Sequence, residues 1–107
     1  MDTSRIERLE RIFVDNPSDT FTLFALAKEY EKAVDLDRAV QLFEKLLVMD
    51  ENYLGAYYHL GKVYEHLDDF TKALNIYEKG IRIAQEQKAM HALGELRNAK
   101  MNLEIGE

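Results

Sequence analysis

Two stretches of this chain decide its fold: TLFALAKEYEKAVDLDRAVQLF at residues 22–43 and AYYHLGKVYEHLDDFTKALNIY at residues 56–77. An offset of 34 residues places Leu26 on Leu60 and Ala39 on Ala73, and Phe43 falls on the aromatic Tyr77. Large residues match large ones and small residues match small ones, as a shared packing geometry requires. A fixed period of this length predicts a repeat protein in which each copy is one supersecondary unit.

Each copy has the apolar spacing of two consecutive helices. In the first copy, one helical stripe at i, i+3, i+4 and i+7 consists of Leu23, Leu26, Ala27 and Tyr30. Asp35 then predicts the N-cap of a second helix, and Asp68 or Asp69 takes that place in the second copy. Gly61 lies inside a predicted helix, where glycine costs about 1 kcal/mol relative to alanine. We therefore expect another helix to approach closely at Gly61.

The second copy carries the pattern Tyr57-x2-Leu60-Gly61-x2-Tyr64, followed by Ala73-x3-Tyr77. This pattern resembles the signature of the tetratricopeptide repeat, with tyrosine in place of the usual leading tryptophan. The first copy lacks the Leu-Gly pair, but Ala27 keeps that position small. The resemblance covers about residues 5–87 and implies an all-α solenoid of antiparallel helix pairs.

The repeat register divides the chain into four parts within one expected domain, residues 1–107. They are an N-terminal half-repeat helix at 4–16, repeat one at 20–53, repeat two at 54–87 and a C-terminal capping helix at 88–105, about six helices in total. We expect the half-repeat helix to pack through Leu9, Ile12 and Phe13. The turn before the last helix is predicted at residues 85–87. A shift of one residue in the register makes Leu93-Gly94 a second Leu-Gly pair.

Composition narrows the classes of partner and compartment. The chain has 107 residues, a net charge of −6 and no cysteine. The absence of cysteine excludes disulfides, thiolate catalysis and cysteine-ligated zinc. It also suits a reducing compartment, so we expect a cytoplasmic protein. The negative charge disfavours nucleic acid as a partner, and no apolar run approaches the ~20 residues that cross a bilayer. We therefore expect neither a nucleic-acid nor a membrane partner.

No motif in the sequence points to catalysis, a metal or a cofactor. His59 and His66 are seven residues apart and His91 is remote, whereas helical zinc sites use tighter spacing such as i and i+4. The paired carboxylate Asp68-Asp69 stands where a helix cap is expected. Phosphate-binding glycine loops and nucleophile elbows are absent from the sequence. We expect a protein that is not an enzyme.

The resemblance implies a concave groove, lined by the first helix of each pair, that grips a peptide or helix of another protein. An aromatic residue followed by lysine at i+4 occurs on both of these helices, at Phe24 and Lys28 and at Tyr58 and Lys62. Such pairs suit a peptide that has a carboxylate and a bulky apolar side chain. The candidate groove residues are Phe21, Phe24, Lys28, Glu31, Tyr58, Lys62, Glu65 and His66.

Three alternatives stay open at this point. The lysines and glutamates of the candidate groove also fit an ordinary solvated helix face. The same surface or a terminal helix could join two copies of the chain, which makes a homo-oligomerising module the second functional hypothesis. An activity without a sequence motif is the third, and it would need titratable groups that converge in a pocket. A family variant that holds terminal carboxylates uses asparagine where this chain has Lys28 and Lys62, so its partner is not carried over.

Overall fold

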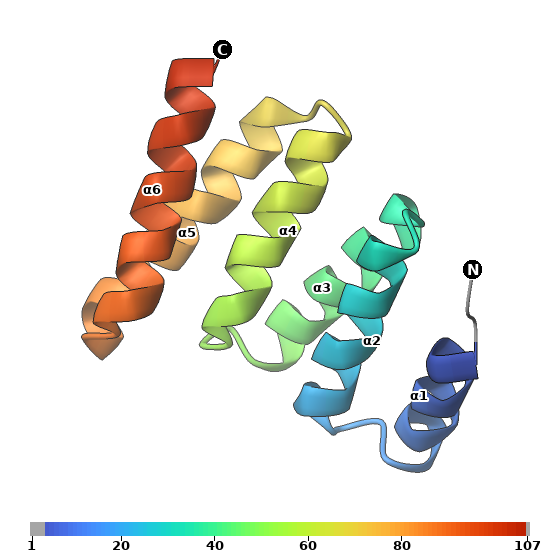
Figure 1. Ribbon diagram of the computed structural model, residues 1–107. Coiled ribbons are helices and arrows are strands. Elements are labelled where there is room, and N and C mark those ends of the chain that lie inside the picture. Colours follow the sequence, from blue (N-terminus) through green and yellow to red (C-terminus); the bar gives the residue numbers. More distant parts are fainter. Residues whose placement is uncertain (1–3, 107) are drawn as a thin grey trace. The chain divides into compact units, whose positions relative to one another are not determined.

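The computed structural model describes residues 4–106 and folds them into six α-helices, with no strand in that range. The helices form two compact units that divide between residues 51 and 52, each with three helices (Figure 1). Consecutive helices within each unit run antiparallel. The predicted all-α architecture of about six helices is confirmed.

The first unit consists of α1 (Ser4–Asp15), α2 (Thr20–Lys32) and α3 (Leu36–Met49). α2 contacts both α1 and α3. The core of the first unit comes mainly from the stripes that the repeat pattern predicts on α2 and α3. The buried apolar residues of this unit are Ile6, Leu23, Leu26, Ala27, Ala39, Leu42, Phe43 and Leu46. The 3.6-residue periodicity thus positions the core of this unit.

The prediction for the packing face of α1 is partly wrong. Ile6 is buried, Leu9 and Phe13 are half-buried, and Ile12 is 49% exposed. Polar contacts to α2 flank the buried face of α1: Arg5 pairs with Glu29 at 3.4 Å, and the Tyr30 hydroxyl donates a hydrogen bond to Glu10. On a helical wheel this face centres on Ile6, and Ile12 lies about 120° away from that centre.

The second unit consists of α4 (Leu54–His66), α5 (Phe70–Gln87) and α6 (Met90–Gly106), and each helix contacts the other two. The expected close approach at Gly61 is confirmed. A Cβ atom at Gly61 would lie 2.6 Å from Cζ and 2.7 Å from Cδ1 of Tyr77. At Gly80 of α5, an added Cβ would meet Cβ of Tyr57 at 2.7 Å. Glycine at these two positions lets α4 and α5 pack closely against each other.

Three helices end in the same kind of turn. Val34, Asp68 and Lys88 have φ values of 62°, 59° and 57°, in the left-handed region. Lys88 directly follows α5, whereas one residue separates Val34 from the end of α2 and Asp68 from the end of α4. The next backbone N–H then donates back to the helix, as from Asp35 to Tyr30 O at 2.9 Å. The turn predicted at residues 85–87 is therefore wrong, because α5 continues through Gln87. Glutamine and glutamate are good helix formers, so the helix runs on until Lys88.

The next helix in both repeats begins with an aspartate cap. Asp35 accepts a hydrogen bond from the backbone N–H of Arg38 at 3.4 Å, and Asp69 accepts one from that of Lys72 at 3.1 Å. Asp69 is thus the capping residue of the predicted Asp68-Asp69 pair, while Asp68 occupies the left-handed turn.

Replacing Val34 with asparagine is expected to raise the free energy of unfolding by about 1 kcal/mol, because a β-branched residue is strained at positive φ and asparagine tolerates it. Val34 is 74% exposed, so the change gives up little burial. Urea denaturation measures the effect. Asp68→Val, 34 residues later, is the reciprocal control and is expected to destabilise by a similar amount. No gain from Val34→Asn together with no loss from Asp68→Val would contradict strain in these turns.

Candidate functional site

In the first unit, α2 holds one of the predicted aromatic–lysine pairs. The Lys28 ammonium lies 4.7 Å from the ring centroid of Phe24. The Phe24 ring is half-buried and packs edge-on against Phe43 of α3, with 6.1 Å between ring centroids. Packing against Phe43 therefore fixes the Phe24 ring, and this ring in turn positions the exposed Lys28 ammonium. Phe21 is 72% exposed and Glu31 is half-buried on the same side of α2.

In the second unit, α4 holds the equivalent pair. The Lys62 ammonium lies 5.6 Å from the Tyr58 ring centroid and 3.8 Å from the Glu65 carboxylate. Tyr58 also packs edge-on against His59, at 5.6 Å between centroids. Nδ1 of His66 lies 2.8 Å from the carbonyl oxygen of Lys62, one turn earlier. The side chains of Lys62 and Glu65 are 32% and 25% exposed, so this pair is more enclosed than an ordinary surface pair.

Glu65 has a structural partner that its place in the sequence does not reveal. Its carboxylate accepts a hydrogen bond from the hydroxyl of the buried Tyr77. Glu65 therefore ties α4 to α5 at the same time as it contacts Lys62. In the first copy, the residue equivalent to Glu65 is Glu31, which lies on α2. Farther along the chain, His91 lies 3.7 Å from Glu95 on α6 and is exposed.

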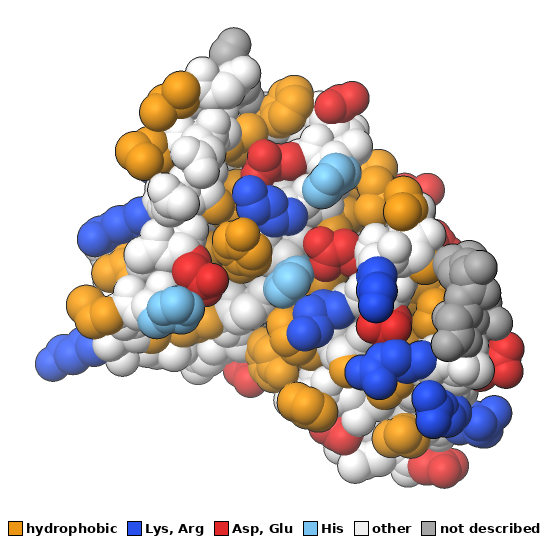
Figure 2. All heavy atoms as spheres, in the orientation of Figure 1, with side chains coloured by type: hydrophobic (Ala, Val, Ile, Leu, Met, Phe, Trp, Pro, Cys, Tyr) orange, Lys and Arg blue, Asp and Glu red, His pale blue; other side chains and the backbone are white. Residues whose placement is uncertain are grey.

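The charges on this side of the helices are mixed. Figure 2 shows basic and acidic side chains interspersed with hydrophobic ones along α4 and α6, without a patch of one sign. Within residues 4–106, no cluster of three or more histidine, cysteine or acidic residues has the geometry to hold a metal ion. The helices described here include none that is long and apolar enough to cross a membrane.

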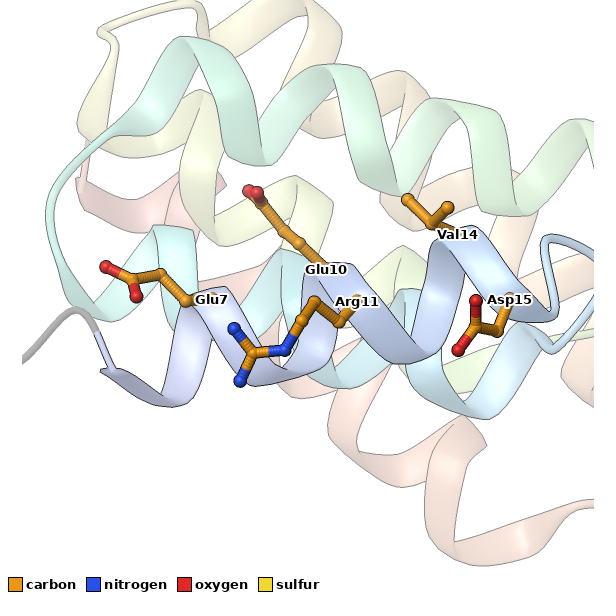
Figure 3. Close-up of a pocket in the computed structure, with 5 residues that line it drawn as sticks. All are labelled: Glu7, Glu10, Arg11, Val14 and Asp15. Atoms are coloured by element: carbon orange, nitrogen blue, oxygen red, sulfur yellow. The ribbon is translucent and has the colours of Figure 1, made fainter.

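The first unit also contains two hollows that the sequence does not predict. One, of about 440 Å³, lies along α1 and is lined by Glu7, Glu10, Arg11, Val14 and Asp15 (Figure 3). The other, of about 380 Å³, lies between α1 and α3 over Leu26 of α2. Its wall includes Phe13 and Lys45, whose ammonium lies 5.3 Å from the Phe13 ring centroid.

Glu10 lines both hollows, and its carboxylate is engaged. It accepts the hydrogen bond from the Tyr30 hydroxyl, which together with partial burial raises the pKa of Tyr30 above its ordinary value of 10.0. The guanidinium of Arg38 lies 5.8 Å from the Tyr30 ring centroid. This arrangement holds α1, α2 and α3 together, and it serves packing better than proton transfer near neutral pH.

Comparison with known proteins places the fold among helical repeats. The sequence model described as tetratricopeptide repeat matches residues 25–96. A crystal structure of a tetratricopeptide repeat domain protein from Salinibacter ruber is 45% identical, covers 83% of this chain and 100% of that one, and superimposes with a TM-score of 0.78. A solution structure described in the same words, from the same organism, is 44% identical over 86% of this chain and 93% of that one, with a TM-score of 0.81.

A third similar structure extends over nearly the whole chain. The solution structure of a protein from Bordetella parapertussis is 25% identical, covers 99% of this chain and 91% of that one, and has a TM-score of 0.86. Among curated proteins, none matches this sequence.

Proposed function

Because this chain belongs to the tetratricopeptide repeat family, whose domains generally mediate protein–protein interactions, we propose that it is a non-catalytic adaptor that binds a peptide or helix of another protein. The proposed contact points are the aromatic–lysine pairs of α2 and α4, with Phe21, Glu31, Glu65 and His66 beside them. As part of the same proposal, the adaptor acts in the cytoplasm and uses no cofactor.

The observation that carries this proposal is the same cation-over-ring arrangement on two helices related by the repeat, Lys28 over Phe24 and Lys62 over Tyr58. An ammonium over an aromatic ring is attracted by about 0.5–1 kcal/mol at exposed sites, so each lysine is partly ordered before a ligand arrives. A pre-ordered lysine loses less side-chain entropy when it pairs with a carboxylate.

The pairs favour one class of ligand. Each offers a cation beside an apolar ring edge, and the protein as a whole carries a net charge of −6. A peptide with one or two carboxylates next to bulky apolar side chains meets both groups, whereas a highly acidic peptide is repelled by the rest of the surface.

The double charge reversal Lys28→Glu/Lys62→Glu is expected to weaken binding of the partner by about tenfold or more, with the melting temperature nearly unchanged. The partner is first captured on immobilised wild-type protein from a lysate of the source cells and identified. Its affinity is then measured for both proteins by isothermal titration calorimetry. Lys79→Glu/Arg82→Glu on α5 is the matched control, because it changes the net charge by the same amount at exposed positions away from the pairs.

Equal loss of affinity in both double variants would mean that the change in net charge explains the effect. It would contradict the assignment of the aromatic–lysine pairs as contact points. Unfolding of the Lys28→Glu/Lys62→Glu protein would contradict the surface role of these lysines. Light scattering over a concentration series completes the experiment. If only the wild type self-associates, the bound chain is a second copy and not another protein.

A further inference from the structure

The last helix, α6, has two apolar faces. α6 lies against α4 and α5 (Figure 1), and the face that packs there carries the buried residues Leu93, Leu96, Ala99 and Leu103. The opposite face carries Met90, Met101 and Ile105, which are 65%, 50% and 76% exposed. Gly94 and Arg97 lie on the same stripe, since the spacing 90, 94, 97, 101 and 105 follows one side of a helix. A helix that only caps a repeat array has a polar outer face, so this surface, the α6 outer face, needs another explanation.

α4, in the same unit, has a face equivalent to the α6 outer face, and α5 packs on it. Counting 33 residues back along the chain, Met90, Gly94 and Arg97 correspond to Tyr57, Gly61 and Tyr64 of α4. All three of those α4 residues contact α5: the Tyr77 ring covers Gly61, Gly80 lies against Tyr57, and the Lys72 ammonium lies 5.7 Å from the Tyr64 ring centroid. The α6 outer face therefore repeats the α4 surface on which α5 packs.

Gly94 distinguishes the two surfaces. A Cβ atom added at Gly61 would collide with the Tyr77 ring, whereas one added at Gly94 would meet no atom within 4 Å in the described structure. Glycine at Gly94 costs helix stability and accommodates no neighbour within the unit. The Leu93-Gly94 pair thus provides the position for an aromatic ring, and that position is open.

We propose that the α6 outer face binds an amphipathic helix of another protein that carries a small residue and, four residues later, a tyrosine. The tyrosine ring covers Gly94 as Tyr77 covers Gly61. Asn98 stands where α4 has Glu65, which accepts the Tyr77 hydrogen bond, so its side-chain oxygen accepts from the bound tyrosine. Arg97 replaces Tyr64, and this favours an acidic residue in the bound helix at the place that Lys72 takes in α5.

A second copy of this chain does not supply such a helix. Its two segments with a small residue followed four residues later by an aromatic are Ala39-x3-Phe43 and Ala73-x3-Tyr77. All four of these residues have 0% exposure in their own units. Offering either segment to a neighbour would require that unit to unfold, and the proposal therefore takes a helix of a different protein as the occupant.

The test uses a helix-stapled, fluorescently labelled peptide with the sequence of residues 70–87 and the change Lys72→Glu, titrated with the intact chain by fluorescence anisotropy. Saturable binding is expected. Gly94→Leu in the protein is expected to weaken it at least about tenfold, and Tyr77→Ala in the peptide by a similar factor. A peptide that keeps Lys72 is expected to bind less tightly, because its ammonium would face Arg97. Asn102→Leu, an exposed α6 position off the stripe, is the matched control and should leave affinity unchanged.

Thermal melting separates binding from folding, since Gly94→Leu is expected to melt no lower than the wild type. Equal binding by wild type and Gly94→Leu, or no saturable binding, would overturn the proposal. Wild-type dimerisation that Gly94→Leu abolishes, seen by sedimentation, would replace the other protein with a second copy and also overturn it. The α6 outer face shares no residue with the lysine pairs, so Lys28→Glu/Lys62→Glu should still bind the peptide. Failure of this proposal and failure of the proposed function are thereby distinguished.

Discussion

Truncation of Tyr77 to alanine is expected to lower the free energy of unfolding by roughly 3–5 kcal/mol. The side chain is fully buried, its ring covers Gly61 of α4, and its hydroxyl donates to Glu65. Removing the ring leaves a cavity between α4 and α5 that the backbone around Gly61 cannot fill. Urea denaturation followed by circular dichroism measures the loss.

Tyr77→Phe separates the hydroxyl from the ring. It keeps the packing and removes one hydrogen bond to a carboxylate, a type of bond that contributes about 1.5–3 kcal/mol when it is lost from a protein interior. Glu65 keeps Lys62 nearby at 3.8 Å, which places the expected cost at the lower end of that range. If Tyr77→Ala cost no more than Tyr77→Phe, the ring would not fill the space between α4 and α5.

The repeat period predicts the parts of this fold that depend on local pattern. Leu26 and Leu60 are buried, and Asp35 and Asp69 cap the second helix of their repeats. These features recur because each copy buries its stripe against the same kind of neighbour. The repeat pattern does not point to Asp19, which caps α2, although Asp19-x-x-Thr22 before an apolar run is a usable signal. The hydrogen bond from the Thr22 hydroxyl lowers the pKa of Asp19.

Features that depend on pairs of residues on different helices could not be predicted. The rotation of α1 follows from Arg5 meeting Glu29 and Glu10 meeting Tyr30, pairs that are 24 and 20 residues apart. No local spacing in α1 distinguishes Ile6 from Ile12 as the buried isoleucine. The left-handed conformation of Lys88 could not be predicted for a different reason: lysine does not typically mark such a turn.

The candidate site divides in the same way. Spacing alone predicts that Lys28 reaches Phe24 and that Lys62 reaches Tyr58, because residues four apart are neighbours on a helix. It does not predict that Glu65 is held by Tyr77, since that contact depends on how α5 packs on α4. Nor does it reveal that Gly61 and Gly94, alike in sequence, differ in whether a ring covers them.

Gly61→Ala is expected to destabilise the protein by about 3 kcal/mol, at the upper end of the cost of overpacking a core. The added methyl group would lie closer than 3.0 Å to three atoms of the Tyr77 ring, and that ring is fully buried and cannot swing aside. Gly94→Ala introduces the same methyl group on α6 into open space. It is expected to stabilise by up to about 1 kcal/mol, the helix propensity difference between the two residues.

Gly61→Ala and Gly94→Ala add the same methyl group and differ in whether a ring lies beside it. Opposite signs of their effects on the free energy of unfolding would therefore show that the Tyr77 ring excludes a side chain at position 61. In a Tyr77→Ala background the ring is gone, and Gly61→Ala is then expected to behave like Gly94→Ala. The coupling between Gly61→Ala and Tyr77→Ala in a double-mutant cycle should therefore be favourable by about 3–4 kcal/mol, measured by urea denaturation. Additive effects would mean that Tyr77 does not exclude a side chain at position 61. The reading of Gly94 as the open counterpart of Gly61 would then lose its template as well.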